Sequence, residues 1–246
     1  MLVKDIWYRL VCMLVMTMRY EIEARHISDC VYQDDPLLFM KLNQTINDDH
    51  NIFNRMASSE RQLLRLKPGA WSENQYPQYS WYVEGMGTLL WALNELKDFA
   101  PHDEAFSYKR IDHYFEQLGP VGIPGMVSAL SKKDVDLRPE SVLKYQWKRA
   151  EIVYKRCVMA FKFRNGEIKM PKKKYSDLFP MQGYDLPVGQ SGDLMVNGKE
   201  FCDIPIKEEG NLCSMSLMRL QTLSWLFDTN VEWDHIHIEG LEELPV

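Results

Sequence analysis

The 246-residue sequence lacks the short motifs by which many enzymes are recognised. It contains no phosphate-binding loop, no dinucleotide-binding fingerprint, no nucleophile elbow and no histidine–glutamate zinc helix. The glycine-rich stretch 183–198 precedes a predicted hairpin, so it lacks the strand-to-helix setting in which a phosphate group is usually bound. These absences favour a protein without catalytic activity, although they do not decide whether it is an enzyme. They give no reason to expect a cofactor.

Closely spaced cysteines are also missing. None of the five has the two-residue spacing of a zinc knuckle or a redox motif. They are Cys12, Cys30, Cys157, Cys202 and Cys213. An odd and scattered set is typical of free, buried thiols in a reducing compartment, which predicts a cytoplasmic protein.

No apolar run reaches the roughly 20 residues that span a bilayer. The apolar stretch near the N-terminus is interrupted by Arg9, and no small-residue cleavage site follows it before Arg19 and Glu21. We therefore predict a buried first helix, neither a signal peptide nor a membrane span. The net charge of −6 argues against general binding to nucleic acid or to an anionic membrane.

The composition, 46% hydrophobic and 26% charged, is that of an ordinary globular protein. Helical periodicity and helix-start signals dominate the chain. They predict helices over 5–27, 34–43, 58–66, 79–93, 106–118, 138–161 and 214–227, a loop at 119–125 and an extended tail at 231–238. The predicted core contains Trp7, Leu10, Leu14, Tyr82, Leu89, Leu90, Leu93, Val153, Leu223 and Trp225.

Residues 165–212 differ from the rest because glycine and proline punctuate them. Within this stretch Asn197-Gly198 separates two short apolar runs, which predicts a hairpin since both turn positions need a positive φ. The predicted fold is therefore mainly α: a single helical domain over residues 1–246 with a small β-hairpin insertion at 165–212.

The predicted central helix, residues 79–93, is too apolar for a surface helix, yet it contains Glu84, Gly85 and Gly87. Glu84 lies at the edge of the apolar stripe, so it is either exposed or needs a cationic partner. Each glycine costs about 1 kcal/mol in a helix interior, which indicates that another element packs closely there.

A candidate polar centre combines Glu84 with two cations on other predicted helices. Arg149 falls within the mostly apolar stripe of the predicted helix 138–161, and Arg219 lies on the last helix. Trp225 and Asp234 complete the candidate lining. The set is either a salt bridge that fixes helix register or an anion-binding pocket, and the structural interpretation is favoured because buried ion pairs are common without chemistry.

Two further patterns have simple interpretations. His235, His237 and Glu239 would share one face of an extended strand, but a solvated strand face is favoured over a metal site. The basic run at 169–174 is interpreted as a solvated loop of an acidic protein, because it has little aromatic interleaving.

Three stretches resemble a bacterial family, domain-of-unknown-function family 4272. The resemblance lies in Trp81-Tyr82-Val83-Glu84 with Leu89-Leu90-Trp91-Ala92-Leu93, in Leu137-Arg138-Pro139-Glu140 with Ala150-Glu151-Ile152-Val153-Tyr154-Lys155, and in Arg219, Leu223-Ser224-Trp225-Leu226 and Trp233-Asp234. It implies a helical fold and no established activity. Histidines that the family carries near these tryptophans are absent here, so an enzymatic site built on them would be missing.

We therefore expect a non-catalytic protein that acts by binding another protein, as an immunity or accessory factor. An acidic surface suits a basic partner, because complementary charge speeds association. The alternative is a small-molecule-binding protein or enzyme whose pocket is lined by the candidate polar centre.

Overall fold

The computed structural model describes residues 3–27, 42, 50–73, 75–119, 122–169, 173–228 and 231–236. The chain forms two compact units. Unit 1 consists of Met1–Asp98, Phe106–Leu137 and Asp228–His235, and unit 2 of Phe99–Ala105, Arg138–Phe227 and Ile236–Val246. Each unit is built from segments that are far apart in the sequence, and the single domain over residues 1–246 stays a prediction.

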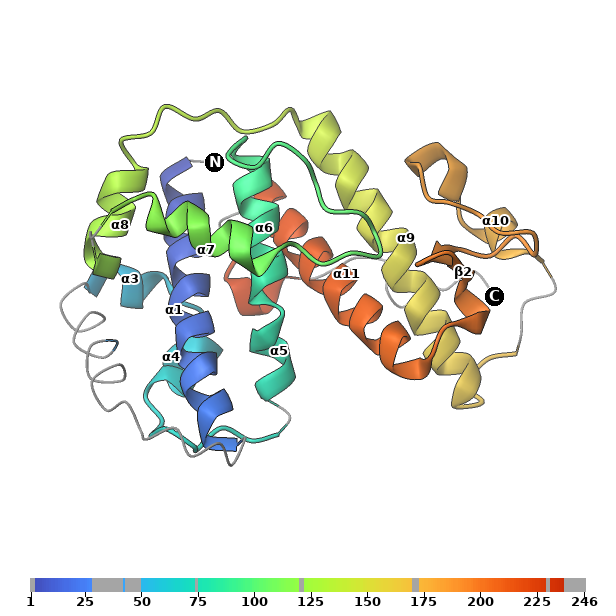
Figure 1. Cartoon of the computed structure of the whole chain (residues 1–246), viewed down its shortest axis with the longest axis horizontal. Helices are drawn as coiled ribbons and strands as arrows, with labels where there is room; N and C mark the ends of the chain where they lie inside the picture. The colour runs from blue at the N-terminus through green and yellow to red at the C-terminus, as the bar shows by residue number, and fades with distance from the viewer. Residues whose placement is uncertain are drawn as a thin grey trace. The chain divides into compact units, whose positions relative to one another are not determined.

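Unit 1 is helical and is organised around its first helix (Figure 1). Its elements are α1 (Val3–Ile27), α3 (His50–Arg55), α4 (Ser58–Leu64), α5 (Tyr76–Ser80), α6 (Tyr82–Ala92), α7 (Tyr108–Glu116), α8 (Gly122–Leu130) and the 3-10 turn η3 (Trp233–His235). Helix α1 packs along α6, and the N-terminal half of α1 is buried almost all round, as predicted. Among the described residues, no helix has the length and apolar character of a membrane span.

Unit 2 is built on two long helices that lie side by side, α9 (Glu140–Arg164) and α11 (Ile206–Phe227) (Figure 1). The indole of Trp147 donates to Ser224 Oγ near one end of the pair, and Arg164 forms an ion pair with Glu209 near the other. Because residue numbers rise along α9 from the first contact to the second while they fall along α11, the two helices are antiparallel. Between them in sequence come α10 (Tyr175–Leu178), η1 (Met181–Tyr184), β1 (Met195–Val196), β2 (Lys199–Glu200) and η2 (Phe201–Asp203).

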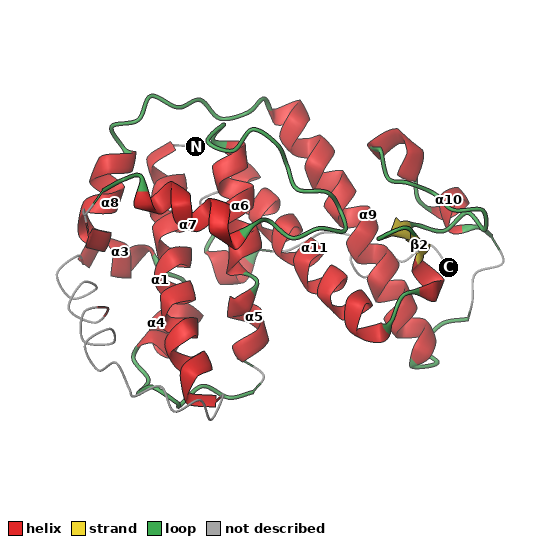
Figure 2. Ribbon diagram, viewed as in Figure 1, coloured by secondary structure: helices red, strands yellow, loops and turns green. Residues whose placement is uncertain are grey.

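The predicted hairpin is confirmed, and with it the mainly α fold (Figure 2). Strands β1 and β2 are antiparallel, with Met195 opposite Glu200 and Val196 opposite Lys199. Asn197 and Gly198 form the turn with φ values of 49° and 77°. Both values lie in the left-handed region, which asparagine and glycine tolerate best.

Three predictions of local structure were wrong. Gly122–Leu130 is helical although 119–125 was predicted as loop; Pro124 is accommodated because a first-turn residue needs no intrahelical N–H bond. Helix α11 begins at Ile206, earlier than predicted, and Trp233–His235, within the segment predicted to be extended, form the turn η3. The predicted helix 34–43 lies, apart from Leu42, outside the described residues. The predicted core is buried except for Leu14, which is half-buried.

A buried ion pair joins α1 to α4 in unit 1. Arg9 donates to both carboxylate oxygens of Glu60, which also accepts from the Tyr82 hydroxyl at 2.7 Å and the Ala57 amide at 2.8 Å. Burial alone would raise the pKa of Glu60, but Arg9 and these hydrogen bonds hold it below its ordinary value. Removal of Arg9 alone would therefore leave an uncompensated buried charge between the two helices.

A second buried pair attaches the insertion to α9. Arg156 donates from Nε and Nη2 to the two carboxylate oxygens of Asp193, at 2.8 and 2.7 Å. Its guanidinium also lies 3.7 Å from the ring centroid of Tyr175 and 3.9 Å from that of Phe201. Through the bidentate pair and the two aromatic contacts, the side chain of Arg156 holds three residues of the insertion, Asp193, Tyr175 and Phe201.

Gly87 tests the close approach that the sequence predicts on α6. A Cβ added there would overlap the ring of Phe106, whose backbone amide donates to Glu84 at 2.7 Å. We expect Gly87→Ala to lower the free energy of unfolding by about 1–3 kcal/mol, because overpacking outweighs the gain in helix propensity. Urea denaturation measures this change. The matched control is Gly210→Ala on the exposed side of α11, where a Cβ meets nothing within 4 Å; it should stabilise the protein by about 0.5–1 kcal/mol.

Candidate functional site

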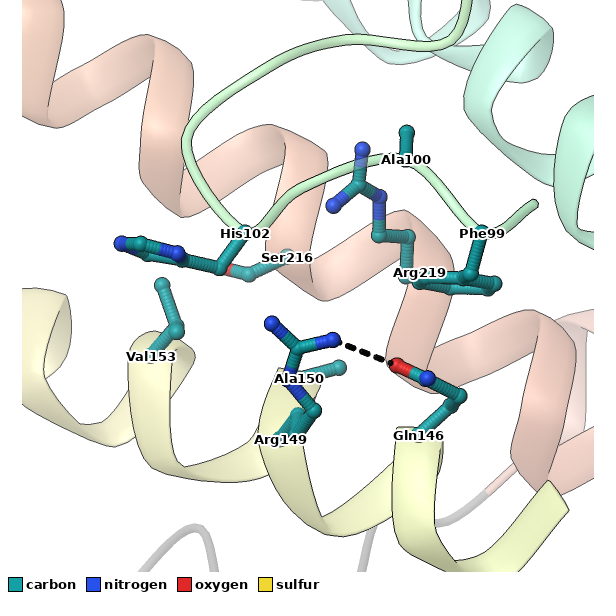
Figure 3. Close-up of a pocket in the computed structure, with 9 residues that line it drawn as sticks. All are labelled: Phe99, Ala100, His102, Gln146, Arg149, Ala150, Val153, Ser216 and Arg219. Atoms are coloured by element: carbon teal, nitrogen blue, oxygen red, sulfur yellow. Dashed lines mark hydrogen bonds between the residues drawn. The ribbon is translucent and has the colours of Figure 1, made fainter. Parts of the chain in front are cut away.

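A pocket in unit 2 is formed by the loop 99–105 and by one face each of α9 and α11 (Figure 3). Its volume is about 250 Å³, including space that is open to solvent. The lining consists of Phe99, Ala100, His102, Gln146, Arg149, Ala150, Val153, Ser216 and Arg219. Because this volume includes open solvent, the enclosed space is far smaller than the roughly 300 Å³ of a pocket for a whole drug-sized ligand, so the site suits a single small group of a ligand.

Arg219 holds the loop that forms one wall of the pocket. It donates from Nη1 to the carbonyl of Pro101 at 2.7 Å and from Nη2 to the carbonyl of Glu104 at 2.6 Å. Its side chain is almost fully buried, and its guanidinium lies 5.3 Å from the ring centroid of Phe99. Arg219 therefore shapes the wall and contributes positive charge, while carbonyl groups occupy two of its nitrogens.

Arg149 is the cation that the pocket leaves available. It is half-buried on α9, and its Nη1 donates to the side-chain oxygen of Gln146 at 3.1 Å (Figure 3). Its Nε is buried without a hydrogen-bond partner, and no carboxylate in the described part of the chain pairs with it. A partly desolvated guanidinium with unused donors favours an anion beside it.

His102 enters the pocket as a neutral imidazole. Its Nε2 lies 2.7 Å from the carbonyl oxygen of Met195, which can only accept, so Nε2 carries the proton. Nδ1 is 3.6 Å from a carboxylate oxygen of Asp103. Burial lowers the pKa of His102, and the nearby guanidinium groups of Arg149 and Arg219 lower it further against the opposing effects of Met195 and Asp103. The positive charge of the pocket therefore comes from its arginines.

Ser216 and His102 share the lining without forming a nucleophile and its base. The Ser216 hydroxyl donates within its own helix, to the carbonyl of Leu212 at 2.7 Å or of Cys213 at 3.0 Å. The nitrogen of His102 that could act as a base is the unprotonated Nδ1, and it lies 3.6 Å from a carboxylate oxygen of Asp103. A nucleophilic serine needs a hydrogen bond to its base, so this geometry favours binding over acyl transfer.

The structure brings together two of the five residues of the predicted polar centre, Arg149 and Arg219. Trp225 is buried on α11 and is not among the residues that line the pocket. Glu84 and Asp234 belong to unit 1. Arg149 is half-buried, as its place on the helix stripe predicted.

Glu84 and Asp234 both accept backbone amides in unit 1. Glu84 is 1% exposed and accepts from the amide of Phe106 at 2.7 Å. Asp234 accepts from the amide and the hydroxyl of Ser59, both at 2.8 Å, and Glu232 accepts in the same way from Ser58. Asp234 and Glu232 therefore satisfy free N–H groups at the start of α4, where the helix dipole favours negative charge.

The described residues give no support to a metal site at His235, His237 and Glu239 or to a binding role of the basic run 169–174. His235 is exposed within η3, whereas His237 and Glu239 lie outside the described residues. No group of three potential metal ligands occurs in the part of the chain that the structure describes. In the basic run, Lys173 and Lys174 are exposed, and Lys172 also lies outside the described residues.

Sequence reasoning missed three polar members of the pocket, Gln146, His102 and Ser216. Gln146 precedes Arg149 by nearly one helical turn, so its spacing could have placed it beside that cation. His102 lies in a loop after Pro101, and nothing local in the sequence distinguishes it from a solvated histidine. Its place follows from contacts with Met195 and from the loop that Arg219 holds.

Comparisons of the chain with protein-family models, curated proteins and solved structures found no match. The resemblance to domain-of-unknown-function family 4272 therefore stays a hypothesis. The candidate function has to be argued from the pocket itself.

The lowered pKa of His102 predicts acid sensitivity. The unfolded chain takes up the proton near pH 6.5, before the folded protein does, so this contribution to stability is complete above that pH and is lost as the pH falls through it toward the lowered folded value. His102→Gln keeps an N–H donor for Met195 but does not titrate. Urea denaturation from pH 8 to pH 5 should show a smaller decline for this variant than for the wild type. His113→Gln, at an exposed position of unit 1, is the control and should follow the wild-type curve.

Proposed function

We propose that the protein is a non-catalytic binding protein whose unit 2 pocket receives the carboxylate group of a small organic anion. One observation carries the proposal. The half-buried guanidinium of Arg149 faces the pocket with unused donors and, among the described residues, without a carboxylate partner. Such a cation is costly to desolvate unless an anion accompanies it.

The rest of the lining favours a singly charged anion with an apolar part. Phe99, Ala100, Val153 and Ala150 supply apolar surface, and Gln146 holds one nitrogen of Arg149 in place. A planar guanidinium presents donors that match the two oxygens of a carboxylate. Because carbonyls occupy two nitrogens of Arg219 and His102 is neutral, few donors remain for the several oxygens of a doubly charged phosphate.

Isothermal titration calorimetry with benzoate and short aliphatic carboxylates tests the proposal. We expect weak but saturable binding that Arg149→Met lowers by about 10- to 100-fold, since hydrogen bonds to a charged group contribute about 1.5–3 kcal/mol. Arg149→Lys keeps the charge but not the fork of donors, so it should fall between the two. Lys144→Met is the matched control, because it removes one positive charge from an exposed position of the same helix.

Two results would contradict the proposal. One is equal affinity of the wild type and a folded Arg149→Met variant for benzoate. The other is tight binding of inorganic phosphate together with no binding of any carboxylate, which would assign the pocket to a different class of anion.

A second candidate function, binding of a basic protein in a bacterial cytoplasm as an immunity or accessory factor, is favoured by one surface feature. Phe161 is 56% exposed and Ile206 is 69% exposed. Phe161 precedes Arg164 by nearly one turn of α9, and Ile206 precedes Glu209 by nearly one turn of α11, so both border the ion pair that joins these helix ends. Exposed apolar side chains beside a charged pair are typical of interaction surfaces.

Native mass spectrometry of protein purified gently from its own host tests this second candidate. A stoichiometric basic protein should accompany the wild type and the Lys144→Met control, and Phe161→Ser should lose it because the apolar contact is gone. A companion that Phe161→Ser and Ile206→Ser both retain would show that this surface is not the interface. Wild-type protein that carries no protein companion would count against the candidate as a whole.

A further inference from the structure

Two cysteines lie at matching heights on the paired helices of unit 2, Cys157 on α9 and Cys213 on α11. The register of the pair follows from the hydrogen bond between Trp147 and Ser224. From Trp147 to Cys157 the chain rises roughly 15 Å along α9, and from Ser224 back to Cys213 roughly 16 Å along α11, at about 1.5 Å per residue. Cys157 and Cys213 therefore lie at nearly the same distance from the Trp147–Ser224 contact along the axes of the two antiparallel helices.

The ion pair at the other end supports the same placement. Arg164 lies roughly 10 Å beyond Cys157 along α9, and Glu209 lies roughly 6 Å before Cys213 along α11. The long side chain of Arg164 spans the difference. Cys157 and Cys213 thus lie between two contacts that fix the helices against each other.

The two thiols also act on one another. Burial, followed by a hydrogen bond with Cys213, raises the pKa of Cys157 well above its ordinary value. The same hydrogen bond lowers the pKa of Cys213. Burial raises the pKa of Tyr154, and both thiols raise it further. Cys157 is 1% exposed, whereas Cys213 is only partly buried.

We propose that Cys157 and Cys213 are a redox modification site, at which exchange with a low-molecular-weight disulfide forms a reversible disulfide between α9 and α11. The sequence spacing hides the pair, because the two cysteines are distant along the chain. The antiparallel register brings them together.

The disulfide forms in two successive exchange steps. The thiolate of Cys213, the more accessible and more acidic of the two, attacks one sulfur of the small disulfide and expels the other as a free thiol. Cys157 then loses its proton, its sulfur attacks Cys213 in the mixed disulfide, and the second small thiol leaves. The protein loses two electrons and two protons, and the small disulfide is reduced to two thiols.

The cross-link would form beside the pocket. Val153 precedes Cys157 by about one turn, and Ser216 follows Cys213 by nearly one turn; both line the pocket. A disulfide would therefore restrict the spacing of the two helices that carry Arg149 and Arg219. This consequence for binding depends on the proposed function, whereas the disulfide itself does not.

The test equilibrates the full-length protein in glutathione buffers of increasing oxidised fraction, traps free thiols by alkylation and maps them by mass spectrometry. We expect Cys157 and Cys213 to lose reactivity together, with loss of two hydrogen atoms and recovery of a cross-linked peptide pair. Dithiothreitol should reverse the change. Cys213→Ser should keep Cys157 reduced, Cys157→Ser should trap glutathione on Cys213, and Cys202→Ser, at an exposed thiol of the same unit, should behave as the wild type.

Wild-type protein that carries glutathione on Cys213 while Cys157 stays reduced would overturn the proposal, and so would a disulfide that maps to another pair. Neither result needs a variant to fold. Urea denaturation of the oxidised wild type adds a second readout: a cross-link between the helices should raise the unfolding midpoint above that of the reduced protein. Benzoate affinity, measured separately on both forms, would report on the pocket and leaves the thiol mapping unaffected.

Discussion

The pocket depends on the two hydrogen bonds that Arg219 donates to the carbonyls of Pro101 and Glu104. The loop between them lacks regular secondary structure and is held internally by the amide of Glu104, which donates to the carbonyl of Pro101 at 3.4 Å, while the carbonyls of Pro101 and Glu104 also accept from outside the loop. One guanidinium supplies both outside donors and fixes the backbone that carries Phe99 and His102. The same bonds divide the roles of the two arginines: Arg219 builds the wall, whereas Arg149 has donors that the described residues leave unused.

Placing two guanidinium groups at one small pocket is unfavourable without an anion, because like charges repel and burial weakens their hydration. The neutral state of His102 limits the cost, since a third cation is avoided. Binding would gain from relief of the remaining repulsion. Under the proposed function, the site would trade stability of the empty protein for affinity, as functional sites commonly do.

The main elements of the fold could be predicted from local patterns, whereas long-range polar contacts could not. Periodicity located α1 and α9, and the Asn197-Gly198 turn located the hairpin. The placement of Arg149 on an apolar stripe likewise predicted that it is half-buried. By contrast, the pairing of Arg156 with Asp193 depends on how the insertion returns to α9, which no local pattern encodes. Glu84 resembles a ligand-binding carboxylate in sequence, and only the structure shows that it accepts a backbone amide.

The proposed anion pocket and the proposed thiol pair both draw residues from α9 and α11, so any influence of one site on the other would act through the spacing of these helices. The Trp147–Ser224 and Arg164–Glu209 contacts oppose large changes in that spacing. Coupling would therefore be modest, and it would be reciprocal. If the Cys157–Cys213 disulfide weakens binding by some factor, the bound anion must disfavour that disulfide by the same factor. The redox potential of the Cys157–Cys213 pair and the affinity of the pocket for the anion would therefore report the same coupling free energy.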